Sequence, residues 1–284
     1  MRRISIGLHG ILRIGCFLLL ASATSYGVDY DPLAASRDFN LQEVDLTVKN
    51  IRRHRDIPIR VYLPQATQVA PVVLFSHGLG GSREGSGYLG KHWAARGYVA
   101  VFLQHPGSDT SVWKDTAREK RMNAMRDAAN LQNFLLRVKD VPAVLDQLAE
   151  WNNMEGHALA GRLNLSKIGM SGHSFGAATT QAVSGQRTDR GKDLFTDARI
   201  AAAVIMSPSS PHRGSPQEAF GKISLPWMLM TGTKDVSLVV DTDVESRLAV
   251  FEALPPGGKY EVVLHGAEHS AFALAAFFLK KNFT

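Results

Sequence analysis

One short segment has the residue types and the spacing that nucleophilic chemistry needs. Gly172-His173-Ser174-Phe175-Gly176 fits the pattern G-x-S-x-G, with a buried apolar run before it and a helical pattern after it. A serine on such a strand-to-helix turn points its hydroxyl into open space, and the glycines leave room for neighbouring backbone. The turn also places the hydroxyl at a helix N-terminus, where the helix dipole favours negative charge. The motif therefore predicts Ser174 as a nucleophile.

A serine is a weak nucleophile until a base removes its proton, so a histidine and an acid are expected later in the chain. Asp235 follows a buried apolar run, and His269 lies in the loop after the apolar run Tyr260 to Leu264. Because parallel strands bring their carboxyl ends to one edge of a sheet, these side chains are expected to meet Ser174 there. Activity should then fall at acidic pH, where a histidine base becomes protonated.

Other acids and histidines near these positions offer alternatives. Asp241 and Asp243 are fallback acids, but they are better explained as the start of the next helix. His265 ends its predicted strand, so a structural role is expected for it. His77 precedes the residues expected to bind a substrate oxygen, and a hydrogen-bonded structural role is expected for it too.

A glycine-rich loop follows the first buried run. The segment Ser76-His77-Gly78-Leu79-Gly80-Gly81-Ser82 is able to aim backbone N–H groups at a substrate oxygen. The N–H groups of Leu79 and Phe175 are the predicted donors of an oxyanion hole, which is the site that holds the negative oxygen of a tetrahedral intermediate.

The elements that must position these residues alternate between strands and helices. The segments Glu43 to Val48 and Ile57 to Leu63 predict two antiparallel strands at one edge of a sheet. Fully buried strands are predicted for Pro71 to Ser76, Tyr98 to Gln104, Ile168 to Gly172, Ile200 to Ser207, Leu225 to Thr231 and Tyr260 to Leu264. Helices are predicted for Ser86 to Ala95, Arg121 to Arg137, Val141 to Asn152, Phe175 to Ser184 and Val244 to Leu254. This alternation is typical of a mostly parallel α/β sheet.

The stretch between Gln104 and Lys167 departs from strict alternation because it holds two helical patterns. Asp140 followed by Pro142 predicts the start of the second helix. Residues 105–165 either cover the sheet or form a lid over a site.

The first 23 residues resemble a secretory signal peptide. Arginines precede the apolar run Ile14 to Leu20, and Ala21-Ser22-Ala23 gives a cleavage pattern. The apolar run is shorter than the roughly 20 residues of a membrane span, so a periplasmic or secreted protein is expected rather than an anchored one. Arg13 disfavours lipidation at Cys16. Because Cys16 is the only cysteine, the mature chain would lack disulfides and a thiol nucleophile.

The composition, with 45% apolar and 20% charged residues, is that of a folded globular protein. The leader holds three of the 32 basic residues and no acidic one, so the mature net charge falls from +6 to +3. This small excess argues against a nucleic-acid partner. The basic run Arg52 to Arg55 is expected to form a solvated turn, or to make weak contact with an anionic lipid or polymer. No histidine and carboxylate cluster has the spacing of a metal site, and no phosphate-binding loop is present.

Four segments together carry a family resemblance: His77 to Gly80, Gly172 to Gly176, Gly232 to Asp235 and Gly266 to His269. In this order they resemble the α/β-hydrolase superfamily, and within it the platelet-activating-factor acetylhydrolase and predicted dienelactone hydrolase group of bacterial serine esterases. The likeness implies a single domain over residues 24–284, with a mostly parallel eight-stranded sheet and helices on both faces. It also implies no cofactor, and hydrolysis of carboxylic esters through an acyl-enzyme.

The resemblance leaves several activities open. Dienelactone hydrolases carry a cysteine where this chain has Ser174, so the likeness describes ancestry more than substrate. A short-acyl or lipid-type esterase acting on a small-molecule or lipid ester is expected. The alternatives are a dienelactone-type or polyester hydrolase, a peptidase, an acyltransferase, and a non-catalytic relative that binds in the same cleft. Only 15 residues follow His269, so the final helix of relatives is expected to be short here, over Ala271 to Leu279.

Overall fold

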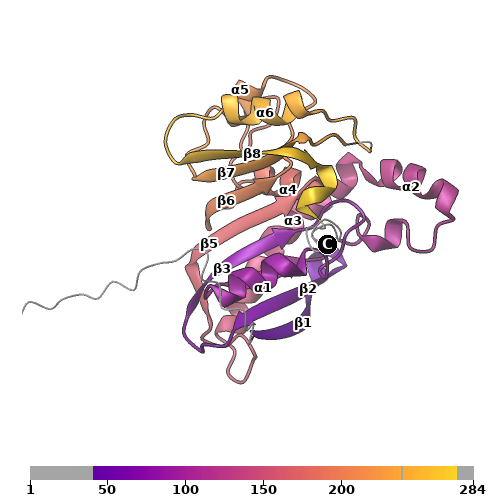
Figure 1. The fold of residues 1–284 in the computed structure, drawn as a ribbon. Helices are drawn as coiled ribbons and strands as arrows, with labels where there is room; N and C mark the ends of the chain where they lie inside the picture. The colour runs from indigo at the N-terminus through magenta and orange to yellow at the C-terminus, as the bar shows by residue number, and fades with distance from the viewer. Residues whose placement is uncertain (1–40, 238, 274–284) are drawn as a thin grey trace, which may run out of the picture. The chain divides into compact units, whose positions relative to one another are not determined.

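The computed structural model describes residues 41–237 and 239–273 (Figure 1). All of them belong to one compact unit, Ala35–Thr284. The expected signal peptide at residues 1–23 lies outside the described residues, and so does most of the expected final helix.

A single sheet of eight strands organises the described residues, in the order β1-β2-β4-β3-β5-β6-β7-β8 (Figure 1). In chain order the strands are β1 Leu41–Asn50, β2 Arg55–Pro64, β3 Ala70–Ser76, β4 Val99–Leu103, β5 Leu163–His173, β6 Ile200–Met206, β7 Trp227–Lys234 and β8 Lys259–Glu268. Strand β2 pairs antiparallel with β1 and β4, and all the other pairs are parallel. The predicted antiparallel edge is therefore confirmed, and each of the six other predicted strands is present. The burial predicted for Tyr260 to Leu264 is wrong: β8 is an edge strand, and Tyr260, Val263 and Leu264 are exposed.

The helices lie on both faces of the sheet, as predicted (Figure 1). Their bounds are α1 Gly87–Ala95, α2 Arg121–Ala128, α3 Leu131–Asn152, α4 Phe175–Val183, α5 Pro216–Phe220 and α6 Val244–Glu252. One face packs against α3, with side chains such as Leu74, Val101 and Val141 fully buried. The opposite face packs against α1, where Phe75 and Phe102 stack with ring centroids 4.7 Å apart.

The prediction of a helix start at Asp140 and Pro142 is wrong. The break falls ten residues earlier, where Asn130 caps α3 by accepting from Asn133 N–H at 2.8 Å. Helix α3 then continues through Pro142. A proline in a helix removes one N–H, so the carbonyl of Val138, four residues before Pro142, loses its usual donor. The Arg53 guanidinium donates to the carbonyls of Leu136 and Lys139, around Val138, at 3.1 and 2.9 Å, and so adds hydrogen bonds to this turn of α3.

The expected solvated turn at Arg52 to Arg55 is also only partly right. Arg52 is exposed, but Arg53 contacts α3 and Arg55 forms a two-bonded ion pair with the buried carboxylate of Asp140, at 2.8 and 2.9 Å. These arginines therefore hold the antiparallel edge of the sheet to α3.

Among the described helices, none is long and apolar enough to cross a membrane.

Candidate active site

The turn between β5 and α4 holds Ser174 in a strained backbone conformation, with φ 57° and ψ −115°. Its N–H donates to the carbonyl of Met206 on the neighbouring strand β6, at 3.1 Å. Non-glycine residues avoid this region unless the surrounding structure imposes it, and such strain is typical of functional turns. The predicted nucleophile thus stands at the tip of a sharp strand-to-helix turn.

The two glycines of the motif are required because neither position has room for a Cβ atom. A Cβ on Gly176 would fall on the carbonyl oxygen of Ser76 in β3, and a Cβ on Gly172 would fall on the carbonyl of Gly176. Both obstacles are backbone atoms in the sheet or at the helix start, so neither moves aside easily. The motif therefore lets α4 approach the sheet closely enough to form the turn.

We expect Gly176→Ala to destabilise the protein by about 3 kcal/mol or more, because the new methyl group would overlap backbone. Gly169→Ala, in the strand β5 that leads into the turn, is the control, since its Cβ would meet nothing closer than 3.7 Å. Urea unfolding of both variants measures the difference. Equal stability of the two variants would contradict this explanation of the motif.

The structure brings the predicted serine, histidine and acid together. Ser174 Oγ lies 2.8 Å from His269 Nε2, and His269 Nδ1 lies 2.7 Å from Asp235 Oδ1. Asp235 follows the last residue of β7, and His269 follows the last residue of β8. The strands β5, β7 and β8 run parallel in one sheet (Figure 1). Ser174, Asp235 and His269, which follow their last residues, therefore come from the same edge of the sheet.

Asp235 is held in one orientation by several donors. Its second oxygen, Oδ2, accepts from Ser207 Oγ at 2.7 Å and from Thr231 Oγ1 at 3.0 Å. Burial alone would raise the pKa of this carboxyl group, but hydrogen bonds from His269 and Ser207 and the charge of Arg247 outweigh burial and lower it. The group is therefore a carboxylate, and it accepts a hydrogen bond from His269 Nδ1–H.

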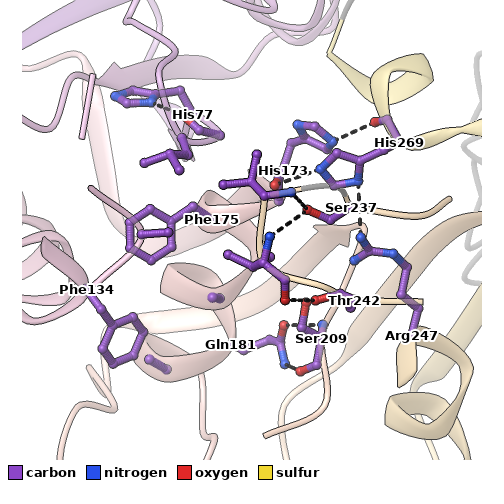
Figure 2. A pocket seen from close by; sticks show the side chains of 18 of the residues that line it. His77, Phe134, His173, Phe175, Gln181, Ser209, Ser237, Thr242, Arg247 and His269 are labelled. Carbon is purple, nitrogen blue, oxygen red and sulfur yellow. Dashed lines mark hydrogen bonds between the residues drawn. The ribbon is translucent and has the colours of Figure 1, made fainter. Parts of the chain in front are cut away.

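Arg247 is a part of the site that the sequence did not reveal. It comes from α6, is fully buried, and its Nε lies 3.0 Å from Asp235 Oδ1. Its Nη2 lies 3.2 Å from His269 Nδ1, and Figure 2 shows His269 between His173 and this guanidinium. The only signal in the sequence is an arginine within a helix that follows the acid, which does not distinguish a buried arginine from an exposed one.

The two predicted oxyanion donors lie beside Ser174. Leu79 and Phe175 line the same pocket as Ser174 and His269, and the adjacent Gly78 stands so close that its Cβ would lie 3.5 Å from Ser174 Cβ. Among the described residues, none accepts a hydrogen bond from either N–H. Both donors are therefore free to bind a substrate oxygen.

The fallback acids lie elsewhere, as expected. Asp243 caps α6 by accepting from Ser246 N–H at 2.8 Å, and Asp241 is an exposed residue in a left-handed turn. His265 is exposed within β8. His77 is buried; its Nδ1 donates to Gly78 O at 2.6 Å and its Nε2 accepts from His105 N–H at 3.1 Å. These contacts match the structural role predicted for His77.

Three buried histidines, His77, His105 and His173, lie near the site. Burial, with the nearby charge of Arg137, lowers the pKa of His105 to about 4 and holds the pKa of His77 well below its usual range. Burial and the neighbouring His269 lower the pKa of His173 to about 3. All three are therefore neutral in the folded protein, whereas in the unfolded chain they take up a proton near pH 6.5.

We expect the free energy of unfolding to fall as the pH drops from about 6.5 towards 4. Because these histidines bind protons only in the unfolded state over this range, acid favours unfolding. Protonation of His105 in the unfolded chain should by itself lower the free energy of unfolding by about 2 kcal/mol between pH 7 and pH 5. Urea unfolding at both pH values measures the loss, which His105→Asn should reduce and the exposed control His212→Gln should not. A midpoint that stays constant over this range would refute the expectation.

The pocket in front of Ser174 has a volume of about 1480 Å³ (Figure 2). This is more than the roughly 1,000 Å³ at the upper end of ordinary ligand sites. Trp113, Met125 and Phe134 contribute to its wall, so part of the segment 105–165 borders the pocket. The rest of α3 packs on the sheet through residues such as Val141 and Leu145. The segment thus covers the sheet and also walls the pocket.

Comparisons with known proteins bear on the family and the fold of the chain. Residues 62–206 match the family model of platelet-activating factor acetylhydrolase, isoform II. This range contains the glycine-rich loop and the turn at Ser174, and it ends before Asp235 and His269. A search of curated proteins finds no match.

Two solved structures share the fold. One is a cold-adapted esterase from an Arctic intertidal metagenomic library, with a TM-score of 0.56 and 19% identity over 81% of this chain and 87% of that one. The other, from Klebsiella pneumoniae, is assigned as a dienelactone hydrolase, with a TM-score of 0.57 and 14% identity over 81% of this chain and 88% of that one. At such low identity the likeness supports the fold, and the predicted α/β-hydrolase architecture is confirmed.

Proposed function

This chain belongs to the platelet-activating factor acetylhydrolase isoform II family of hydrolases, and we propose that it is a serine esterase that cleaves carboxylic esters through an acyl-enzyme. The observation that carries the proposal is the row of hydrogen bonds from Ser174 Oγ to His269 Nε2 and from His269 Nδ1 to Asp235, at 2.8 and 2.7 Å. A serine, a base and an orienting acid in this arrangement perform acyl transfer on several unrelated folds.

In the acylation step, Ser174 Oγ forms a bond with the ester carbonyl carbon while His269 Nε2 takes its proton. The carbonyl oxygen becomes an oxyanion, which the N–H groups of Leu79 and Phe175 are placed to bind. Asp235 keeps the Nδ1 proton on its own side of the ring and stabilises the imidazolium ion. Breakdown of the intermediate returns the proton from His269 to the alcohol and leaves the acyl group on Ser174.

In the deacylation step, water takes the place of the serine hydroxyl. His269 removes a proton from the water as it attacks the acyl carbonyl, and the same two N–H groups hold the second oxyanion. The carboxylic acid leaves and the proton returns to Ser174. No cofactor is needed in either step.

A lipid or short-acyl ester is the substrate that we propose. The large pocket, with Trp113, Phe134 and Phe175 in its lining, supports an apolar ester more than a charged peptide. We further propose that residues 1–23 direct export and that the segment 105–165 acts as a cover over the acyl site.

Labelling with a fluorophosphonate probe tests the serine-hydrolase chemistry directly. Wild-type protein should be labelled, and a p-nitrophenyl ester series of increasing acyl length, with an acetylated phospholipid included, should reveal the preferred acyl chain. Wild-type protein that is neither labelled nor active on any member of the series would exclude an esterase and favour a non-catalytic binding protein.

A further inference from the structure

Arg137 of α3 lies behind the proposed oxyanion hole and is fully buried. Among the described residues, none offers its guanidinium a carboxylate within 4.0 Å; the nearby Asp140 is bound instead by Arg53, Arg55 and His105. An arginine buried without a direct ion pair is costly, and burial lowers its pKa to about 9. The hydrogen-bond partners of this guanidinium are neutral hydroxyl and carbonyl groups around the site.

One set of contacts fixes the glycine-rich loop. Arg137 Nη2 donates to the carbonyl of His77, directly before Gly78 and Leu79. Arg137 Nη1 donates to Ser108 Oγ at 2.9 Å, and the carbonyl of Ser108 accepts from Gly80 N–H at 2.9 Å. The guanidinium thus supports the loop on both sides of Leu79.

A second set of contacts fixes the other donor. Arg137 Cζ lies 4.7 Å from the centre of the Phe175 ring, in a cation–π contact. Arg137 Nε donates to Thr179 Oγ1 at 3.1 Å, and this hydroxyl donates to the carbonyl of Phe175 at 3.0 Å. Figure 2 shows His77 and Phe175 on one side of the pocket, with Arg247 and His269 on the other.

From this geometry we propose that Arg137 is a positioning residue that holds the N–H groups of Leu79 and Phe175 in register for the oxyanion. The two donors come from segments about a hundred residues apart, and Arg137 contacts both segments through rigid, forked hydrogen bonds. Its unpaired positive charge also favours the negative oxygen that develops in the transition state. The inference rests on the proposed acyl-enzyme chemistry.

The test compares Arg137→Lys and Arg137→Met with Thr179→Val, which removes one link to Phe175 and keeps the shape of the side chain. Thr180→Val is the matched control: Thr180 is equally buried on the same helix and bonds the Gly176 carbonyl at 2.9 Å, without touching Arg137. Rates on p-nitrophenyl acetate are expressed per active site, counted by complete fluorophosphonate labelling, so that unfolded protein does not count.

Loss of donor alignment should lower kcat about 10²- to 10³-fold in Arg137→Met, the effect of losing one oxyanion donor, with KM changed only a few-fold. Arg137→Lys should recover part of the loss, and Thr179→Val should lose about tenfold. A trifluoromethyl ketone, which forms an oxyanion with the serine, should bind more weakly in proportion to kcat/KM.

A purely structural role would lower thermal stability in Arg137→Lys and Thr179→Val and leave kcat and ketone affinity per active site unchanged. That result would overturn the inference while wild-type activity still supports the esterase. An equal loss in Thr180→Val would also overturn it. Absence of activity in the wild-type protein would instead contradict the proposed function itself.

Discussion

Ser174→Ala should reduce the hydrolysis of a short p-nitrophenyl ester by a factor on the order of 10⁶. Without Oγ there is no nucleophile 2.8 Å from His269 Nε2, and only the binding of the ester and its oxyanion remains. Fluorophosphonate labelling should disappear completely. The fold should remain intact, because alanine keeps the backbone and removes no group that supports the sheet.

Ser171→Ala is the matched control for this variant. Ser171 lies three positions earlier in β5 and is fully buried, and its hydroxyl has no hydrogen-bond partner among the described residues. Removing a buried hydroxyl that lacks a partner costs little stability and can add some. Full activity in Ser171→Ala together with loss in Ser174→Ala would assign the chemistry to one hydroxyl. A wild-type rate of hydrolysis in Ser174→Ala would contradict the assignment of Ser174 as the nucleophile.

Asp235→Ala should lower kcat by about 10⁴-fold, the size of effect found when the acid of such a triad is lost. The reason here involves Arg247 as well. With the carboxylate gone, the Arg247 Nη2 at 3.2 Å becomes the partner of His269 Nδ1 and donates to it. The ring proton then sits on Nε2. This nitrogen faces Ser174 as a hydrogen-bond donor and cannot take the proton of the serine hydroxyl.

Two further variants separate this explanation from simple loss of charge. In Asp235→Asn, the oxygen can remain towards His269 and Arg247 while the NH₂ group faces the hydroxyls of Ser207 and Thr231, which are able to accept. We therefore expect a smaller loss of kcat than in Asp235→Ala. Adding Arg247→Leu to Asp235→Ala should restore part of the activity. If the double variant is no better than Asp235→Ala, the tautomer explanation is wrong.

The fold could be predicted where the signal is local. Apolar runs such as Ile168 to Gly172 and Ile200 to Ser207 are too short and too apolar for surface helices, and the structure has strands there. One exception is α3, where the proline rule gave the wrong boundary and Pro142 lies inside the helix. Arg53, more than 80 residues away in the chain, holds this turn by bonding the carbonyls of Leu136 and Lys139 and the carboxylate of Asp140, and no local pattern reveals such a partner.

The sequence by itself determined which three residues meet in the site. The G-x-S-x-G motif identified Ser174. The order of the residues in the chain, and their positions after predicted strands, identified Asp235 and His269. These choices depend on steric rules that act within a few residues and on the common edge of parallel strands. Only the tertiary structure decided that Arg137 and Arg247 lie buried beside the predicted oxyanion donors and Asp235. Arginine is mostly exposed in proteins, so its type and spacing do not predict burial. Burial depends on partners such as Thr179 and Ser207, more than 35 residues away along the chain, which the folded sheet brings within hydrogen-bond distance.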